Sequence, residues 1–167
     1  AFPMCGLASV RHTTLGFAKV LKVGYKGLRK EINDRLTRGG LDARGIDLLE
    51  AMRLCVDAVG VWHRRHIDEL RDRIVKSSGD EKAEYERVLA NLRNVPENPP
   101  TSFAEAVQSL WFLYAFQRSC GQWPGIGRMD KILGSYLEAD LAGGKIKRDE
   151  ARELIAHFWI KGTESCG

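Results

Sequence analysis

The sequence predicts a mainly α-helical protein, and three observations support this fold class. Apolar residues recur at spacings of three and four along most of the chain, which is the period of an amphipathic helix. Glycine pairs and prolines interrupt this pattern at intervals typical of helix lengths. No segment has the sustained alternation of apolar and polar residues that indicates a strand. We therefore expect six helices, which form a single helical segment over residues 1–167.

The first two helices are expected to follow an irregular opening segment. Residues 1–16 lack a helical period, so we expect a loop or a short strand there. The next apolar stripe predicts a helix over residues 17–36, and the pair Gly39-Gly40 ends it. A second, longer helix is expected from about Asp42 to Ser77. Its apolar stripe consists of Leu49, Met52, Val56, Val59, His63, Ile67, Leu70 and Ile74.

The third helix is expected over residues 81–93, with Asp80 as its N-cap. Pro96 and the pair Pro99-Pro100 then favour an extended crossing, because a residue before proline avoids the helical region. After a Gly/Pro-rich loop the fifth helix covers residues 129–141. The sixth begins at about Arg148 and has one apolar face, formed by Ala151, Leu154, Ile155, Phe158 and Trp159.

The fourth helix, over residues 103–116, differs from the others. Thr101 or Ser102 provides its N-cap, and Glu105 stands three residues after Ser102, as in a capping box. This helix is apolar around most of its circumference, which is typical of a helix buried on all sides. We expect the five other helices to leave part of it uncovered, so that a missing part of the chain or a partner covers the rest.

Composition and charge exclude several classes of protein. Apolar residues make up 44% of the chain and charged residues 29%, which is typical of a globular protein. The net charge is +4, but basic and acidic residues alternate, as in Arg71-Asp72-Arg73, which argues against nucleic-acid binding. No apolar run approaches the roughly 20 residues that span a membrane, and no secretory signal is visible. Together with four widely spaced cysteines, which we expect to be free thiols, this predicts a cytoplasmic protein.

Spacing alone predicts no catalytic or metal site. His63 and His66 are three residues apart on one helical turn, but no further ligand completes a metal site, so we interpret them as helix-surface or interface residues. The run from Gly125 to Arg128 has two glycines of a phosphate loop and lacks the rest of that motif. Glu138 and Asp140 point to different sides of a helix, which argues against an acid/base pair.

Several ordered blocks resemble the pyruvate formate-lyase domain of the glycyl radical enzymes. The run 99–112 reads PPTSFAEAVQSLWF and is similar to the family pattern P-P-x-x-F-x-E-A-x-Q-x-x-W-F. The run 127–130 reads GRMD, similar to G-R-x-D, and 136–141 is similar to a block that carries Tyr and Asp-Leu. The run 150–161 reads EARELIAHFWIK and matches E-A-x-x-L-x-x-x-F-W-I-K. Upstream, HTT at 12–14 is similar to the family's Gly-His-Thr stretch, although Arg11 replaces the glycine.

The resemblance implies a helical segment of a pyruvate formate-lyase-like α/β-barrel enzyme. In this family a glycyl radical near the C-terminus passes its spin to a cysteine, and the thiyl radical then breaks a bond in a small organic substrate. The implied parent is a lyase, a dehydratase or a formate acetyltransferase (a transferase) of anaerobic metabolism. Its implied partners are a radical S-adenosylmethionine activating enzyme, the remainder of the parent chain and further copies in a homo-oligomer.

The resemblance also assigns candidate site residues. His12 matches a family histidine that lies by the substrate, and Gln122 and Trp123 fall in the loop before Gly-Arg-x-Asp, where dehydratases often carry Asn-Gly-His-Ser. We therefore expect these three residues to contact substrate. Neither radical-bearing residue is present: Cys120 and Cys166 lack the Glu that follows the thiyl cysteine, and Gly24 only partly matches the setting of the radical glycine.

We therefore expect no catalytic residue, no bound cofactor and no metal in this segment, and no activity from it alone, although the parent needs a glycyl radical. The alternative hypothesis is a stand-alone helical scaffold or binding module without catalysis. A downstream Cys-x-Glu loop and a terminal radical glycine would favour the first interpretation, and a stop codon directly after Gly167 would favour the second.

Overall fold

The computed structural model describes residues 14–121 and 124–163 of the chain. Six helices are present in these ranges, as the sequence predicts: α1 (Phe17–Thr37), α2 (Ala43–Lys76), α3 (Gly79–Leu92), α4 (Phe103–Ser119), α5 (Met129–Ala142) and α6 (Arg148–Thr163). Among the described residues the only β-structure is one isolated parallel bridge between Thr14 and Gly125. The mainly helical fold class is therefore confirmed. None of the described helices is long and apolar enough to cross a membrane.

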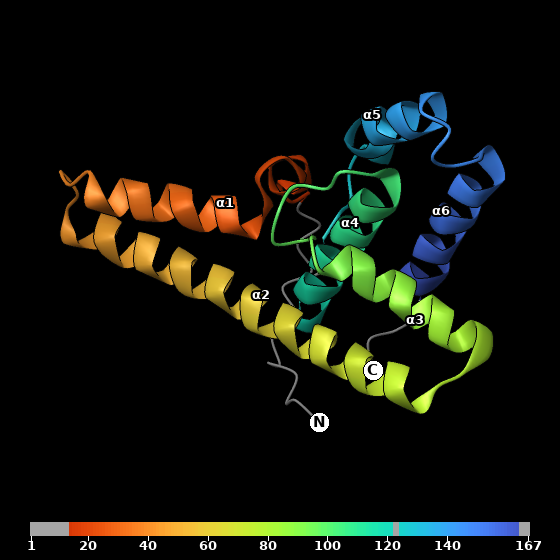
Figure 1. Cartoon of the computed structure of the whole chain (residues 1–167). Helices are drawn as coiled ribbons and strands as arrows, with labels where there is room; N and C mark the ends of the chain where they lie inside the picture. The colour runs from red at the N-terminus through yellow and green to blue at the C-terminus, as the bar shows by residue number, and fades with distance from the viewer. Residues whose placement is uncertain (1–13, 122–123, 164–167) are drawn as a thin grey trace.

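The helices form a long hairpin attached to a more compact group (Figure 1). Helices α1 and α2 run antiparallel, and their connection forms a tip that projects away from the other elements. Helix α3 returns along the far end of α2 and packs against it. Helix α4 lies in the middle of the compact group and packs against α1, α3, α5 and α6. This arrangement makes α4 the centre of the fold.

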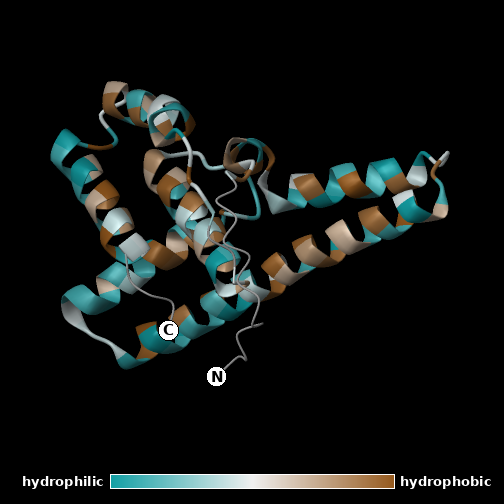
Figure 2. Ribbon diagram, turned by 180° about the vertical axis from the view of Figure 1, so that it is seen from behind, coloured by the Kyte–Doolittle hydropathy of each residue, from teal (hydrophilic) through white to brown (hydrophobic). Residues whose placement is uncertain are grey.

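Several large apolar side chains remain exposed, and Figure 2 shows that apolar residues follow the projecting hairpin. Most of them belong to α2, including Met52, which the apolar period assigned to the buried stripe but which is 46% exposed. The stripe is wrong at this position because the projecting part of α2 packs against α1 and lies away from the compact group. The exposed set consists of Ile46, Leu48, Met52, Leu54, Val61, Val75, Trp159 and Ile160.

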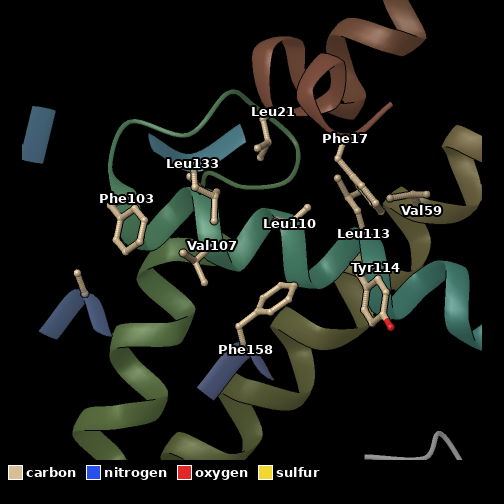
Figure 3. Packing of buried hydrophobic residues seen from close by; sticks show 12 residues of the cluster. Phe17, Leu21, Val59, Phe103, Val107, Leu110, Leu113, Tyr114, Leu133 and Phe158 are labelled. Carbon is tan, nitrogen blue, oxygen red and sulfur yellow. The ribbon is translucent and has the colours of Figure 1, made fainter. Parts of the chain in front are cut away.

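Helix α4 is buried by the described residues themselves (Figure 3). Its side chains Phe103, Leu110 and Phe112 are only 1%, 0% and 3% exposed. Around α4 lie Phe17 and Leu21 of α1, Val59 of α2, Leu133 of α5 and Phe158 of α6. The prediction that these residues need further polypeptide to cover them is therefore wrong. Trp111 and Phe116 of the same helix are half-buried, and the ring centroid of Trp111 lies 5.7 Å from that of Phe158.

Helix α1 contains a break that the apolar stripe did not predict. Gly24 has φ 65° and ψ 170°, and its backbone is buried. The residues after the break bond to the proline-rich crossing, because the Tyr25 N–H donates to Pro96 O at 3.0 Å and the Lys26 N–H donates to Glu97 O at 3.1 Å. A Cβ on Gly24 would lie 2.1 Å from Glu97 O. Glycine is therefore required here by both its conformation and the close contact.

The helix starts show which capping predictions hold. The Asp42 side chain accepts from Gly45 N at 2.8 Å and caps α2. Ser102 accepts from Glu105 N at 3.2 Å and caps α4, as the capping-box spacing predicted. The prediction for α3 is wrong, since Ser78 is its N-cap residue and Asp80 lies inside the first turn. There the Asp80 carboxylate still favours the helix, because a negative charge interacts well with an N-terminus.

Candidate functional site

Two segments that are far apart in the sequence meet beside Thr14. The parallel bridge joins Thr14 to Gly125, so the segment that leads into α1 lies next to the loop that leads into α5. A Cβ on Gly125 would lie 3.2 Å from Thr14 Oγ1, and a Cβ on Gly127 would lie 2.9 Å from Thr14 Cγ2. Gly127 also has φ +78°, a conformation that favours glycine. The two glycines therefore permit the close approach of the two segments.

In the sequence, the candidate substrate-contacting residues come directly before the two segments that meet at this junction. His12, Gln122 and Trp123 lie outside the described residues, so the structure leaves their predicted roles untested. Their described sequence neighbours are Thr14 on one side and the buried Pro124 on the other. The structure thus brings together the two described segments that adjoin these residues.

The Gly-Arg-x-Asp motif fixes the exit of the loop into α5. Arg128 donates two hydrogen bonds to Asp130, from Nε to Oδ1 at 2.8 Å and from Nη2 to Oδ2 at 2.5 Å. These bonds and the positive charge of Arg128 lower the pKa of Asp130 to about 2. The Met129 N–H also donates to Gly127 O at 3.2 Å, where α5 begins. Two parallel hydrogen bonds between a guanidinium and a carboxylate restrict the geometry of the turn, although both side chains are exposed.

A buried carboxylate holds the start of α4 against α5. Asp140 is 5% exposed, and its Oδ2 accepts a hydrogen bond from the Phe103 N–H at 2.6 Å. The first N–H groups of a helix lack partners within the helix, so this side chain satisfies one of them. Lys145 Nζ lies 3.8 Å from the other oxygen, Oδ1, and offsets part of the buried charge. The family's Asp-Leu block therefore has a structural role in the described residues.

Glu105 fixes the proline-rich crossing to the same end of α4. Its Oε2 accepts from Thr101 N at 2.6 Å, from Thr101 Oγ1 at 2.9 Å and from Asn94 Nδ2 at 2.9 Å. Three donors therefore converge on one carboxylate oxygen. The Glu of the first sequence block thus holds residues 94–105 together.

His63 connects three elements from a buried position, and its interpretation as a helix-surface or interface residue is corrected here. It is 2% exposed, and its Nε2–H donates to Leu92 O at 2.7 Å. Nδ1 then accepts from the Tyr25 hydroxyl at 3.2 Å, because the other nitrogen carries the proton. Burial lowers the pKa of His63, and burial also raises the pKa of Tyr25 to about 12. Both groups therefore remain uncharged near pH 7.

Metal binding and disulfide formation find no support in the described part of the chain. No cluster of three or more His, Cys, Asp or Glu side chains that could hold a metal is found there. His66 instead bonds to Trp62 O at 2.9 Å through Nδ1. Cys55 and Cys120 are exposed free thiols, while Cys5 and Cys166 lie outside the described ranges.

Comparison with known proteins assigns the family. The family model "Pyruvate formate lyase-like" matches residues 6–165. An isethionate sulfite-lyase from Desulfovibrio desulfuricans is 33% identical over 157 residues, which are 89% of this chain and 19% of that protein. The chain therefore belongs to the glycyl radical enzyme family, in its pyruvate formate lyase-like branch.

Solved structures of relatives share the fold. The glycerol-bound B12-independent glycerol dehydratase from Clostridium butyricum has a TM-score of 0.83 at 26% identity, covering 92% of this chain and 20% of that one. A Roseburia inulinivorans protein, solved in a study of 1,2-propanediol dehydration, has a TM-score of 0.81 at 29% identity, with the same two coverages. The chain thus spans about a fifth of the length of these relatives.

Proposed function

We propose that this chain is one helical segment of a larger glycyl radical enzyme, which breaks a bond in a small organic substrate by radical chemistry. The observation that carries the proposal is the bridge between Thr14 and Gly125. It joins the segment after His12 to the segment after Trp123, the two places to which the family resemblance assigns substrate contacts. A helical segment that brings two substrate-contacting loops together is consistent with one part of an α/β-barrel active site.

The sequence positions of the candidate residues support a shared site. His12 and Trp123 are each two positions in the sequence from a bridged residue, Thr14 or Gly125. In this proposal all three side chains bind and orient the substrate, while the radical glycine and the thiyl cysteine come from the remainder of the parent enzyme.

The 167-residue chain alone is then inactive, because it lacks both radical-bearing residues. A radical S-adenosylmethionine enzyme activates the parent, which works in the cytoplasm as a homo-oligomer. The test compares this chain with the longer polypeptide expressed from the same gene, each incubated anaerobically with an activating enzyme. We expect a glycyl radical doublet by electron paramagnetic resonance from the longer polypeptide and none from the 167-residue chain. A doublet from the 167-residue chain would contradict the proposal.

The substrate is assigned by activity of the longer polypeptide on the substrates of relatives. Isethionate, trans-4-hydroxy-L-proline, 1,2-propanediol and glycerol represent the proteins it matches. The loop reads Cys-Gly-Gln-Trp where the dehydratase pattern has Asn-Gly-His-Ser, which argues against a glycerol-type pocket. Sulfite release from isethionate is therefore the first activity to measure, and glycerol is the expected poor substrate.

A stand-alone helical scaffold is the second candidate, and one observation favours it. The described residues bury α4 without further polypeptide, so they have a core of their own. A gene that ends after Gly167, together with a cooperative thermal transition of the isolated chain, would support this alternative over the first.

A further inference from the structure

The side of α2 that faces away from α1 is apolar and exposed between Leu48 and Val61. Leu48 is 61% exposed, Leu54 63% and Val61 41%. Successive residues of a helix are about 100° apart, which places these side chains and those between them on one half of the helix surface. We call this surface the outer face, and it consists of Leu48, Ala51, Met52, Leu54, Cys55, Ala58 and Val61.

The charged residues of the same stretch lie along one edge of the outer face, towards α1. Asp57 bonds to Arg29 of α1 with a distance of 2.6 Å between Oδ1 and Nε. Arg53 lies 2.6 Å from Glu50 and 3.6 Å from Asp57, so all three charges of residues 48–61 belong to one network on the α1 side. The outer face therefore has no charged residue over almost four helical turns. A helix face that is exposed only to water normally carries charged residues, so this uncharged face indicates a contact surface.

The outer face continues into a contact that is already made within the chain. One turn beyond Ala58, Trp62 packs against α4, with its ring centroid 4.3 Å from that of Phe112 and 5.5 Å from that of Phe116. Helix α4 thus covers this side of α2 near the compact group and leaves it uncovered towards the tip of the hairpin. The uncovered part of α2 is apolar, as a helix–helix contact surface is, and it lies beyond the end of α4.

We propose that the outer face is the docking surface for an apolar segment of the longer polypeptide, an inference that rests on the proposed function. The relatives have about four times as much polypeptide outside the matched segment as within it. The four large side chains of the face, about half exposed, form a smaller apolar patch than the roughly 800 Å² per partner of a stable dimer. A segment of the same polypeptide needs less area, because it does not lose the translational freedom of a separate partner.

Cys55 provides a direct test, because its exposed thiol lies in the middle of the outer face. With Cys5, Cys120 and Cys166 replaced by serine, a fluorescent maleimide labels Cys55 alone in the 167-residue chain. In the longer polypeptide, which has further cysteines in this proposal, the label on Cys55 is quantified by peptide mapping. The labelling rate is measured in the 167-residue chain and in the longer polypeptide, each relative to its rate in urea. We expect labelling at least tenfold slower in the longer polypeptide, and a rate in the short chain that does not depend on its concentration.

The other possible outcomes of the labelling experiment lead to different conclusions about the outer face. Equal labelling rates in the two proteins would overturn the inference, and protection that grows with the concentration of the short chain would assign the face to a second copy instead. A second variant, Ala58→Asp, should lower the melting temperature of the longer polypeptide by several degrees and leave that of the short chain unchanged. A longer polypeptide that forms the glycyl radical but labels freely at Cys55 would overturn only this inference. A gene with no further coding sequence would overturn the proposed function as well.

Discussion

The Asp140 carboxylate accepts a hydrogen bond of 2.6 Å from the backbone N–H of Phe103, 37 positions away in the sequence. Replacing Asp140 with alanine leaves this N–H buried without a partner, which costs roughly 1–3 kcal/mol. We expect Asp140→Ala to lower the free energy of unfolding of the 167-residue chain by that amount, measured by urea denaturation. Glu138→Ala, at an exposed position on the same helix, is the control and should change it by less than about 0.5 kcal/mol. Equal effects of the two substitutions would contradict the capping role.

Gly24→Ala should destabilise the chain more than a positive φ alone accounts for. The added Cβ would lie 2.1 Å from Glu97 O, so α1 would have to move away from the proline-rich crossing. Gly39→Ala is the matched control, because Gly39 has φ 72° but open space around its Cβ position. We expect about 1–2 kcal/mol for the control and a clearly larger loss for Gly24→Ala, measured by thermal and urea denaturation. A loss for Gly24→Ala no larger than that of the control would show that the contact with Glu97 is unimportant.

The contact between Thr14 and Gly127 should appear as coupling between two substitutions. Gly127→Ala brings a methyl group to 2.9 Å from Thr14 Cγ2, whereas Thr14→Ser removes Cγ2 and keeps the hydroxyl. The double variant should therefore recover part of the stability that Gly127→Ala loses, with a coupling energy of about 0.5–3 kcal/mol. Strictly additive changes in melting temperature would show that the two segments do not touch in solution. In the longer polypeptide, Gly127→Ala should also reduce turnover if this junction positions the substrate loops.

The buried His63 should make stability depend on pH. Burial lowers its pKa in the folded state, so the unfolded chain takes up a proton first as the pH falls below about 6.5. Stability is therefore full above that pH and decreases as the pH falls towards the pKa of the folded state. We expect the melting temperature to fall between pH 7.5 and pH 5.5, and this fall to be smaller in His63→Gln. His157→Gln, at an exposed position, should keep the dependence of the original chain, and an unchanged dependence in His63→Gln would contradict the assignment.

The sequence predicted the elements that depend on local pattern and missed those that depend on contacts between distant residues. The helix positions follow from apolar period, glycine pairs and the capping boxes, which are properties of neighbouring residues. The break at Gly24 was missed because the apolar stripe of α1 continues across it, and its cause is the backbone of Glu97, far along the chain. Asp140 gave no signal for the same reason, since its partner Phe103 lies on another helix.

For the candidate site, too, the sequence identified local motifs and missed contacts between distant residues. Family motifs identified the loops around His12 and Gln122 but could not show that glycines let the adjoining segments touch. His63 was interpreted as a helix-surface or interface residue because no further ligand completed a metal site, although it also occupied an apolar stripe position. That position was the available signal of burial. Its partners, Tyr25 and Leu92, come from two other helices and could not be inferred from spacing.

The break at Gly24 separates two roles within α1. Before it, Phe17 and Leu21 are buried in the core, a few residues after the bridge between Thr14 and Gly125. After it, the helix pairs with α2, and its first turn is held by hydrogen bonds to Pro96 and Glu97. The hairpin is therefore anchored at its base independently of its length. Whole turns can be gained or lost at the tip during evolution while the bridge between Thr14 and Gly125 keeps its position. The length of the hairpin can therefore change together with the surface that it contacts.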